Sequence, residues 1–312
     1  MSMVGISAII ALFAALASAT GDVIRQRSAH EITDEEEVGH LKLFGMSLRD
    51  AKWWTGGGCA VLNYSLQAMA LAFASVVLVT ALQVTALLFA LPIYARLAHH
   101  RITRSQWLWA TVLAASLAVV IIVGDPAAGH DRAPLSTWIV VAAVMGPILV
   151  SCVVAAKVWH GRPQAAALLA LVAGSSLALF AVLTKGVVDV LHHQGLWAAV
   201  TTPEFIPWLV VMLCGMIFQQ SAFRAGSLTA SLPTMTVAKP VVATILGVLV
   251  LGETLDADGP EGFVLAIAAA VVITATVALA RGEAANMEAD AEEAHRTDGP
   301  EKAAPVITAA DS

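Results

Sequence analysis

The chain has 312 residues, of which 58% are hydrophobic and only 13% are charged, and its formal net charge is −6. Soluble domains contain about 45–50% apolar and about 25% charged residues, so this chain has too few charges to coat one soluble core of its size. Composition and length therefore exclude a soluble globular protein and predict a polytopic helical membrane protein.

Nine apolar segments are long enough to cross a bilayer. A hydrocarbon core of about 30 Å takes about 20 residues of helix, and long apolar runs without alternation favour helices over transmembrane strands. We expect spans at residues 3–24, 55–75, 76–97, 105–124, 136–157, 165–188, 205–223, 228–251 and 262–280. The predicted fold class is an all-α polytopic membrane protein with nine transmembrane helices.

Basic residues are distributed unevenly between the two sides of this arrangement. The N-terminal side receives Arg132, whereas Lys185 and Lys239 fall within spans. The opposite side receives 14 of the 17 Lys and Arg residues, namely Arg25, Arg27, Lys42, Arg49, Lys52, Arg96, Arg101, Arg104, Lys157, Arg162, Arg224, Arg281, Arg296 and Lys302. Because cytoplasmic loops are enriched in Lys and Arg, we expect a multi-pass protein of the cytoplasmic (inner) cell membrane, with its N-terminus outside and its C-terminus in the cytoplasm.

Two segments lie outside the predicted spans. The internal loop 25–54 begins acidic and ends in an amphipathic stretch at 41–49, which either lies on the inner membrane surface or is a plain connector. Residues 282–312 are rich in Ala, Glu and Asp and contain Pro300 and Pro305. That composition predicts a disordered, acidic cytoplasmic tail.

The two halves of the chain resemble each other after a shift of 152 residues. Gln67 then lies over Gln219, and the stretch 76–101 lies over 228–253. Matching helices are five apart in the order of spans and so run in opposite directions, which predicts an inverted repeat of the kind found in secondary transporters. Within a transporter domain at 1–281, repeat one covers about 3–124 and repeat two about 165–281. Each repeat contains four helices, and the helix at 136–157 links the two repeats.

The segment from Ala238 to Leu255 resembles the signature of the drug/metabolite transporter superfamily. It has a proline early in the penultimate helix, Gly252-Glu253 at the end of that helix, and a final apolar helix afterwards. The helix count, the external N-terminus and Thr184-Lys185 are similar to the NIPA-like magnesium transporter branch. Two features depart from the superfamily pattern, because Lys239 precedes the proline and the first repeat lacks a Gly-Glu ending. The resemblance implies a secondary transporter whose two repeats face each other around a central cavity.

Lys239 falls in the middle of the predicted span 228–251. A charge at that depth costs roughly 2.5–3.5 kcal/mol, so this lysine is expected to face a polar cavity, pair with a partner or lose its proton. It is a candidate contact for an anionic substrate, with a structural ion pair as the alternative. Pro233 and Pro240 on the same helix predict a helix break used in gating, or simple packing around proline.

Other polar residues within the spans are candidates for the same cavity. Lys185 and Asp189 are spaced i,i+4 and can pair on one helix face, either as a gate or as an interfacial pair. Buried amides in lipid must form hydrogen bonds across helices, and they serve as cavity lining or as contacts between helices. The amides in question are Gln67, Gln83, Gln219 and Gln220.

An acidic group near the outer end of the penultimate helix is a candidate rim for collecting cations. Glu253, Asp256 and Asp258 provide carboxylate oxygens, which bind hard cations such as Mg²⁺, although a plain solvated loop has the same composition. No metal ligand set is assigned from the sequence. Nucleotide-binding, nucleophile and metalloprotease motifs are missing, so neither enzymatic activity nor a cofactor is expected. No basic aromatic patch indicates nucleic-acid binding.

The function predicted is secondary transport of a small solute by alternating access, with a polar or anionic metabolite or a lipid head group as cargo. The alternative cargo is Mg²⁺, which the NIPA-like resemblance suggests. A protonated lysine 6 Å from a divalent ion would repel it by about 5 kcal/mol at an effective dielectric constant of about 20. A different class is also open: a non-transporting scaffold or accessory subunit that docks cell-envelope enzymes through the 25–54 loop. Expected partners are the lipid bilayer and the solute, and a homodimer is one assembly that the architecture allows.

Overall fold

A computed structural model describes residues 3–31, 51–97, 103–160, 162–224, 228–255 and 259–298. These residues are nearly all helical, and the part of the chain so described contains no strand beyond one isolated bridge between Ala127 and Thr254. Seven of the helices are long and apolar enough to cross a membrane. The molecule is therefore a multi-pass helical membrane protein, as its composition predicts.

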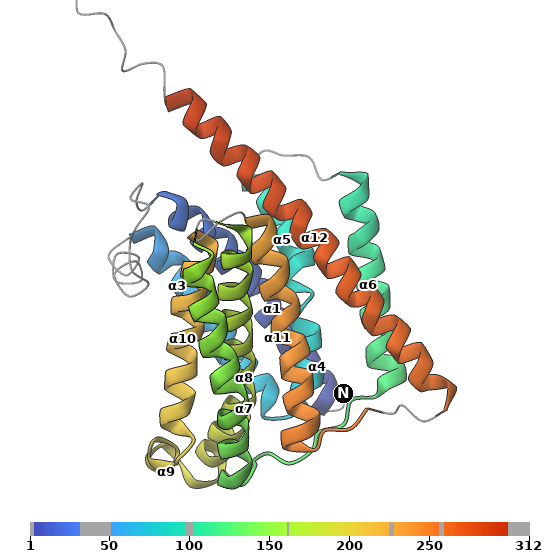
Figure 1. Cartoon of the computed structure of the whole chain (residues 1–312). Coiled ribbons are helices and arrows are strands. Elements are labelled where there is room, and N and C mark those ends of the chain that lie inside the picture. Colours follow the sequence, from blue (N-terminus) through green and yellow to red (C-terminus); the bar gives the residue numbers. More distant parts are fainter. Residues whose placement is uncertain are drawn as a thin grey trace, which may run out of the picture.

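The helices follow the predicted spans closely, usually to within a few residues. Figure 1 shows that the N-terminus and the far end of the last helix lie at opposite ends of the molecule. In chain order the helices are α1 (Met3–Glu31), α3 (Ala51–Leu71), α4 (Val76–Gln83), α5 (Ala86–Leu97), α6 (Arg104–Gly124), α7 (Leu135–Val158), α8 (Pro163–Gln194), α9 (Leu196–Thr201), α10 (Phe205–Arg224), α11 (Leu228–Leu251) and α12 (Pro260–Asp298).

The segment predicted as one span at 76–97 is broken into α4 and α5. The backbone N–H groups of Val84 and Thr85 bond to Ala81 and Leu82 in a tight turn, at 3.1 and 3.0 Å. The Thr85 hydroxyl also donates to the Leu82 carbonyl at 2.6 Å, so local bonds replace the helical ladder there. By contrast, α11 continues as one helix through Pro233 and Pro240. The interruption thus lies in α4–α5 and not at the prolines of α11, for which the sequence allowed either a helix break or simple packing.

The final helix is longer than predicted. Residues 282–298, expected to be disordered, continue α12 as far as Asp298. This part of the chain is rich in Ala and Glu, which have high helix propensity, and that propensity explains the correction. Residues 299–312 and the amphipathic stretch 41–49 lie outside the described residues.

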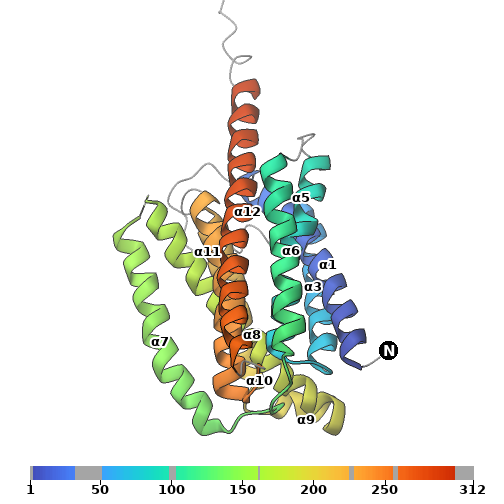
Figure 2. The ribbon, with the colours of Figure 1, turned by 90° about the vertical axis from the view of Figure 1, so that its right-hand side faces the viewer.

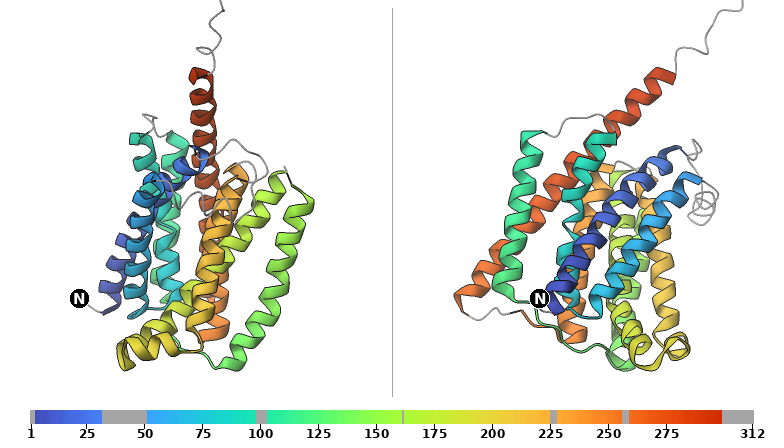
Figure 3. Two further views of the ribbon diagram at one scale, coloured as in Figure 1. Left: turned by 90° about the vertical axis from the view of Figure 1, so that its left-hand side faces the viewer. Right: turned by 180° about the vertical axis from the view of Figure 1, so that it is seen from behind.

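Two similar groups of helices form the body of the molecule. In one group α1 packs against α3, α4 and α5, and in the other α8 packs against α10 and α11. The groups meet where α4 contacts α11, while α6 and α12 pack against each other on the outside. Figure 2 shows α7 on one flank, and the right-hand view of Figure 3 shows α6 and α12 crossing beside the body. Only 11% of the α7 span is buried, against 78% of α8, so α8 is central and α7 faces the surroundings.

Gly174 allows α8 to approach α11 closely. A Cβ at this position would lie 2.9 Å from the Cβ of Ala238 and 3.1 Å from the carbonyl oxygen of Met235. Small residues at crossings bring membrane helices together in this way. The close approach holds Lys239, the next residue after Ala238, against the centre of the bundle.

Replacing Gly174 with leucine should force α8 and α11 apart. Overpacking costs about 1–3 kcal/mol, which corresponds to a fall in melting temperature of several degrees, on the order of 5 °C, for a chain of this size. Thermal unfolding of the purified protein in detergent measures the change. The matched control is Gly146→Leu on α7, where nothing lies within 4 Å of the added Cβ. Equal melting temperatures for the two variants would contradict the expected close packing.

Candidate functional site

A polar cavity of about 100 Å³ lies between the two groups of helices. Its lining comes from α1, α3, α4, α8, α10 and α11, together with residues at the break between α4 and α5. The polar part of the lining consists of the hydroxyls of Ser18, Tyr64, Thr80 and Thr236, the amides of Asn63, Gln83 and Gln219, and the charged side chains of Asp22 and Lys239. Three residues selected from the sequence, Lys239, Gln83 and Gln219, therefore meet in one place.

A chain of hydrogen bonds crosses the cavity from α11 to α3. The Nζ of Lys239 donates to Oε1 of Gln83 at 2.7 Å, and Nε2 of Gln83 donates to Oδ1 of Asn63 at 3.2 Å. Gln83 is the last residue of α4, so the ammonium of Lys239 lies at the carbonyl end of that helix. The partial negative charge of a helix C-terminus favours a cation there. Local packing and the α4 dipole thus account for a lysine at this depth.

Asp22 contributes a negative charge to the cavity lining. It lies on α1, and its Oδ2 accepts a hydrogen bond from the Ser18 hydroxyl at 3.0 Å. Because the sequence places Asp22 next to the basic residues at 25–27, it resembles an interfacial residue at the end of a span. The structure continues α1 to Glu31, which makes Asp22 an internal helix residue. Its i,i+4 spacing from Ser18 was the one signal in the sequence that pointed to a shared helix face.

The four predicted glutamines do not form one site. Gln83 and Gln219 line the cavity, whereas Gln67 and Gln220 are buried but are not part of its lining. Neither amide atom of Gln67 has a hydrogen-bond partner among the described residues. The pairing of Gln67 with Gln219 in the sequence comparison therefore does not bring both side chains to the cavity.

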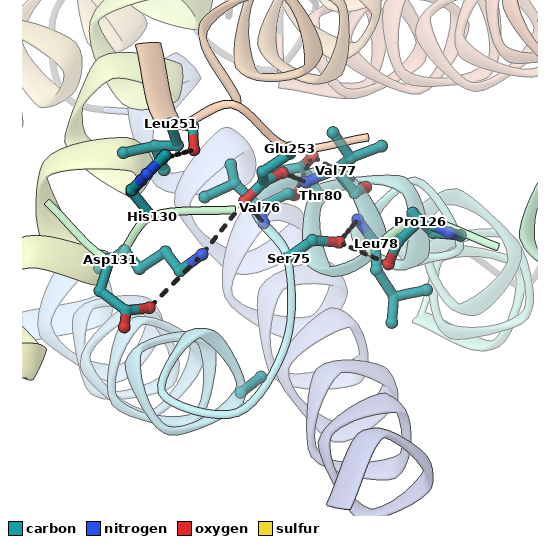
Figure 4. Close-up of polar contacts among 12 residues, drawn as sticks. Ser75, Val76, Val77, Leu78, Thr80, Pro126, His130, Asp131, Leu251 and Glu253 are labelled. Atoms are coloured by element: carbon teal, nitrogen blue, oxygen red, sulfur yellow. Dashed lines mark hydrogen bonds and ion pairs between the residues drawn. The ribbon is translucent and has the colours of Figure 1, made fainter. Parts of the chain in front are cut away.

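A second polar cluster, formed by Glu253, Lys185 and the first residues of α4 and called the closure below, lies on the side of the N-terminus (Figure 1). Glu253 follows α11, and its two carboxylate oxygens accept hydrogen bonds from the backbone N–H groups of Val76 and Val77, at 2.6 and 2.9 Å. Oε1 also lies 3.3 Å from the Nζ of Lys185 on α8. Figure 4 shows Glu253 against the first residues of α4. The carboxylate thus caps the positive end of α4 and joins it to α8.

These contacts change two interpretations made from the sequence. Lys185 pairs with Glu253 and lies 3.7 Å from Asp131, whereas Asp189 pairs with His193 at 3.0 Å. The expected i,i+4 pair between Lys185 and Asp189 is therefore replaced by other pairs. The side chain of Glu253 is 0% exposed, so it is not part of an open rim. Asp256 and Asp258, the other rim candidates, lie outside the described residues.

Neighbouring loops hold the closure in place. The Ser75 hydroxyl accepts from the Leu78 N–H at 3.1 Å and caps α4, while it also donates to the Pro126 carbonyl at 3.2 Å. The His130 N–H donates to the Leu251 carbonyl at 2.7 Å. A Cβ on Gly247 would lie 2.7 Å from Oε2 of Glu253, so only glycine leaves room for the carboxylate.

Helix α4 connects the closure to the cavity. This helix of eight residues runs from Val76, which Glu253 binds, to Gln83, which Lys239 binds, and it spans about 12 Å at 1.5 Å per residue. A turn precedes this short helix and another follows it. Glu253 therefore binds the start of α4 through backbone N–H groups, and Lys239 binds its last residue through a side-chain amide.

No group of three or more His, Cys, Asp or Glu side chains suited to a metal ion occurs among the residues that the structure describes. The cysteines Cys59, Cys152 and Cys214 are free and lie on three different helices, α3, α7 and α10. They offer no disulfide framework, which agrees with their positions within apolar spans.

Comparison with known proteins gives one informative relative. The chain is 35% identical over 281 residues to an uncharacterized protein of Corynebacterium glutamicum, and the match covers 88% of this chain and 95% of the relative. No protein-family model matches the sequence. No solved structure matches it either.

Proposed function

The chain belongs to the family of the uncharacterized Corynebacterium glutamicum protein, and we propose that it is a secondary transporter that carries a small polar or anionic solute across the membrane by alternating access. The observation that carries this proposal is the polar cavity beside Lys239, which lies between two groups of helices. Ionisable groups buried at membrane depth usually mark substrate or ion pathways.

We further propose nine crossings arranged as an inverted repeat of the drug/metabolite transporter type. The seven helices that qualify by length and composition are then joined by α3 and by the broken pair α4–α5. The opposite positions of the N-terminus and the end of α12 in Figure 1 support an odd number of crossings. The packing of α1 on α3, α4 and α5 parallels that of α8 on α10 and α11, which supports two equivalent units with α7 as the linking helix.

We take the buried contacts of Glu253 to keep the protein closed on the N-terminal side, which we assign to the outside of the cell from the distribution of basic residues. In the proposed cycle, an anionic group of the substrate replaces Gln83 as the acceptor for Lys239. This exchange frees the C-terminal end of α4, and movement of α4 separates Val76 and Val77 from Glu253. Broken helices perform this kind of movement in other transporters.

Lys239 gives the cavity a binding contact for a negatively charged group of a substrate. Lys239 provides a cation, Asn63 and Gln219 provide amide donors and acceptors, and Asp22 provides one carboxylate. A divalent cation would be repelled by the ammonium of Lys239, whereas an anionic or zwitterionic solute would complement it. A polar metabolite and a lipid head group share the chemistry that this lining recognises.

Uptake by the purified full chain in proteoliposomes tests the proposal. The panel contains organic anions, amino acids and Mg²⁺, and protein-free liposomes are the control. We expect saturable uptake of an anionic or zwitterionic solute. Accumulation of Mg²⁺ alone would overturn the anionic cargo. Failure of every solute, together with loss of cellular function on changing the 25–54 loop but not on changing Lys239, would support a scaffold instead.

A further inference from the structure

An apolar crevice lies directly behind the polar cavity. It has a volume of about 270 Å³ and is lined by residues of α4, α6, α11 and α12. Among the described residues that line it, Thr244 and Thr276 provide the only hydroxyl groups, and the rest are Val, Leu, Ile, Ala and Pro side chains. A space with this lining suits a hydrocarbon chain better than an ion.

The crevice and the polar cavity share a wall. Val84 and Pro240 line both spaces. Val84 lies at the break between α4 and α5, and Pro240 directly follows Lys239. The side chains of Val84 and Pro240 therefore separate the polar cavity beside Lys239 from the apolar crevice. Val84 lies where the helix is interrupted between α4 and α5.

The crevice is packed at both ends and open on one side. Leu255 and Leu265 pack around Gly124 at one end, and a cluster that includes Leu113 and Leu279 packs α5, α6 and α12 together at the other. Two of its lining residues, Ile245 and Ile273, are 50% and 41% exposed. The crevice thus reaches the surface of the molecule on two helices that are long and apolar enough to cross a membrane.

We propose that the substrate is an anionic amphiphile taken from the bilayer, with its charged head against Lys239 in the cavity and one hydrocarbon chain in this crevice. The inference rests on the transport function proposed above and names its substrate class. The thin wall between the two spaces, at the break between α4 and α5, and the charge of Lys239 select this occupant. Lipid tails are as apolar as the crevice, so the chain gains little affinity by moving there. The charged head therefore determines how tightly the substrate binds, and the crevice determines which chain shapes fit.

A photoreactive probe tests this assignment in proteoliposomes of the full chain. The probe is hexadecyl phosphate with a diazirine in mid-chain, and the neutral control is the corresponding alcohol. We expect cross-links on α11 and α12 within the crevice, at least fivefold more with the phosphate than with the alcohol. Lys239→Met and Ala269→Phe should each reduce this labelling at least fivefold, because the first removes the head contact and the second fills the crevice.

Ala270→Phe is the matched control, because Ala270 is exposed on the same helix but does not line the crevice. If the phosphate and the alcohol label equally, and Ala269→Phe labels like the wild type, the probe reacts from bulk lipid and the inference is overturned. If Lys239→Met then still abolished uptake of a short polar anion, the proposed transport function would stand without the amphiphile. If Lys239→Met changed neither labelling nor uptake, the transport site itself would be refuted.

Discussion

Lys239→Met should lower uptake of an anionic substrate by at least tenfold while leaving the folded protein in the membrane. A hydrogen bond to a charged group contributes about 1.5–3 kcal/mol, and about 1.4 kcal/mol corresponds to a factor of ten in binding. Uptake into proteoliposomes at matched protein content measures the loss. Lys239→Arg should retain part of the activity, because it keeps the charge but changes the geometry of the head-group contact.

Stability should change little in the same variant because two effects oppose each other. Removing a lysine from membrane depth recovers roughly 2.5–3.5 kcal/mol, whereas Gln83 loses the donor that lies 2.7 Å from its oxygen, at a cost of about 1–3 kcal/mol. Lys157→Met, at the end of the exposed helix α7, is the matched control and should transport normally. Normal uptake by Lys239→Met would remove the basis of the proposed site.

The position of Lys239 was predictable because one physical constraint dominates it. An ammonium in the middle of an apolar span needs a polar environment wherever the helix packs, so the sequence alone indicates a cavity or a partner. Gln83 follows by the same reasoning, since an amide in lipid must find a hydrogen bond. The identity of the partner did not follow, because Lys239 and Gln83 are 156 residues apart and meet only through the packing of α4 on α11.

The closure on the N-terminal side was not predictable from local patterns. Glu253 belongs to an acidic stretch that resembles a solvated loop, yet its side chain is fully buried against backbone N–H groups 176 and 177 residues away. Those N–H groups are available only because α4 begins at Val76, and the apolar run at 76–97 contains no residue that marks its break. Asp22 was overlooked for a related reason, since the end of α1 is hidden among the charges that follow it.

Glu253→Gln should open the N-terminal side of the protein. The substitution leaves Lys185, which is 2% exposed, paired with Asp131 at 3.7 Å, a side chain that is 60% exposed, and removes its buried partner at 3.3 Å. Breaking a buried ion pair costs up to about 3–5 kcal/mol. The amide also replaces one of the two oxygens that bind Val76 and Val77. Both effects act on the closed conformation, so the equilibrium shifts toward the open one.

Labelling of Thr80→Cys in the cavity, with the three native cysteines replaced by alanine, measures the opening. A membrane-impermeant maleimide added to intact cells should react at least tenfold faster in the Glu253→Gln background. Trp197→Cys, at a position that is 82% exposed on α9, is the control and should react equally in both backgrounds. Its failure to react would instead refute the external position assigned to this side.

The double variant Lys185→Met/Glu253→Gln separates the loss of a charge from the loss of a contact. It lacks both charges of the buried pair and leaves only the exposed Asp131 without its contact to Lys185, so it should label more slowly than Glu253→Gln alone, with a coupling between the two changes of about 0.5–3 kcal/mol. The carboxamide introduced at position 253 in this background can still accept one hydrogen bond from the start of α4. If the double variant labels as fast as the single one, the ion pair is irrelevant to closure, and the bonds from Glu253 to Val76 and Val77 alone keep the N-terminal side shut.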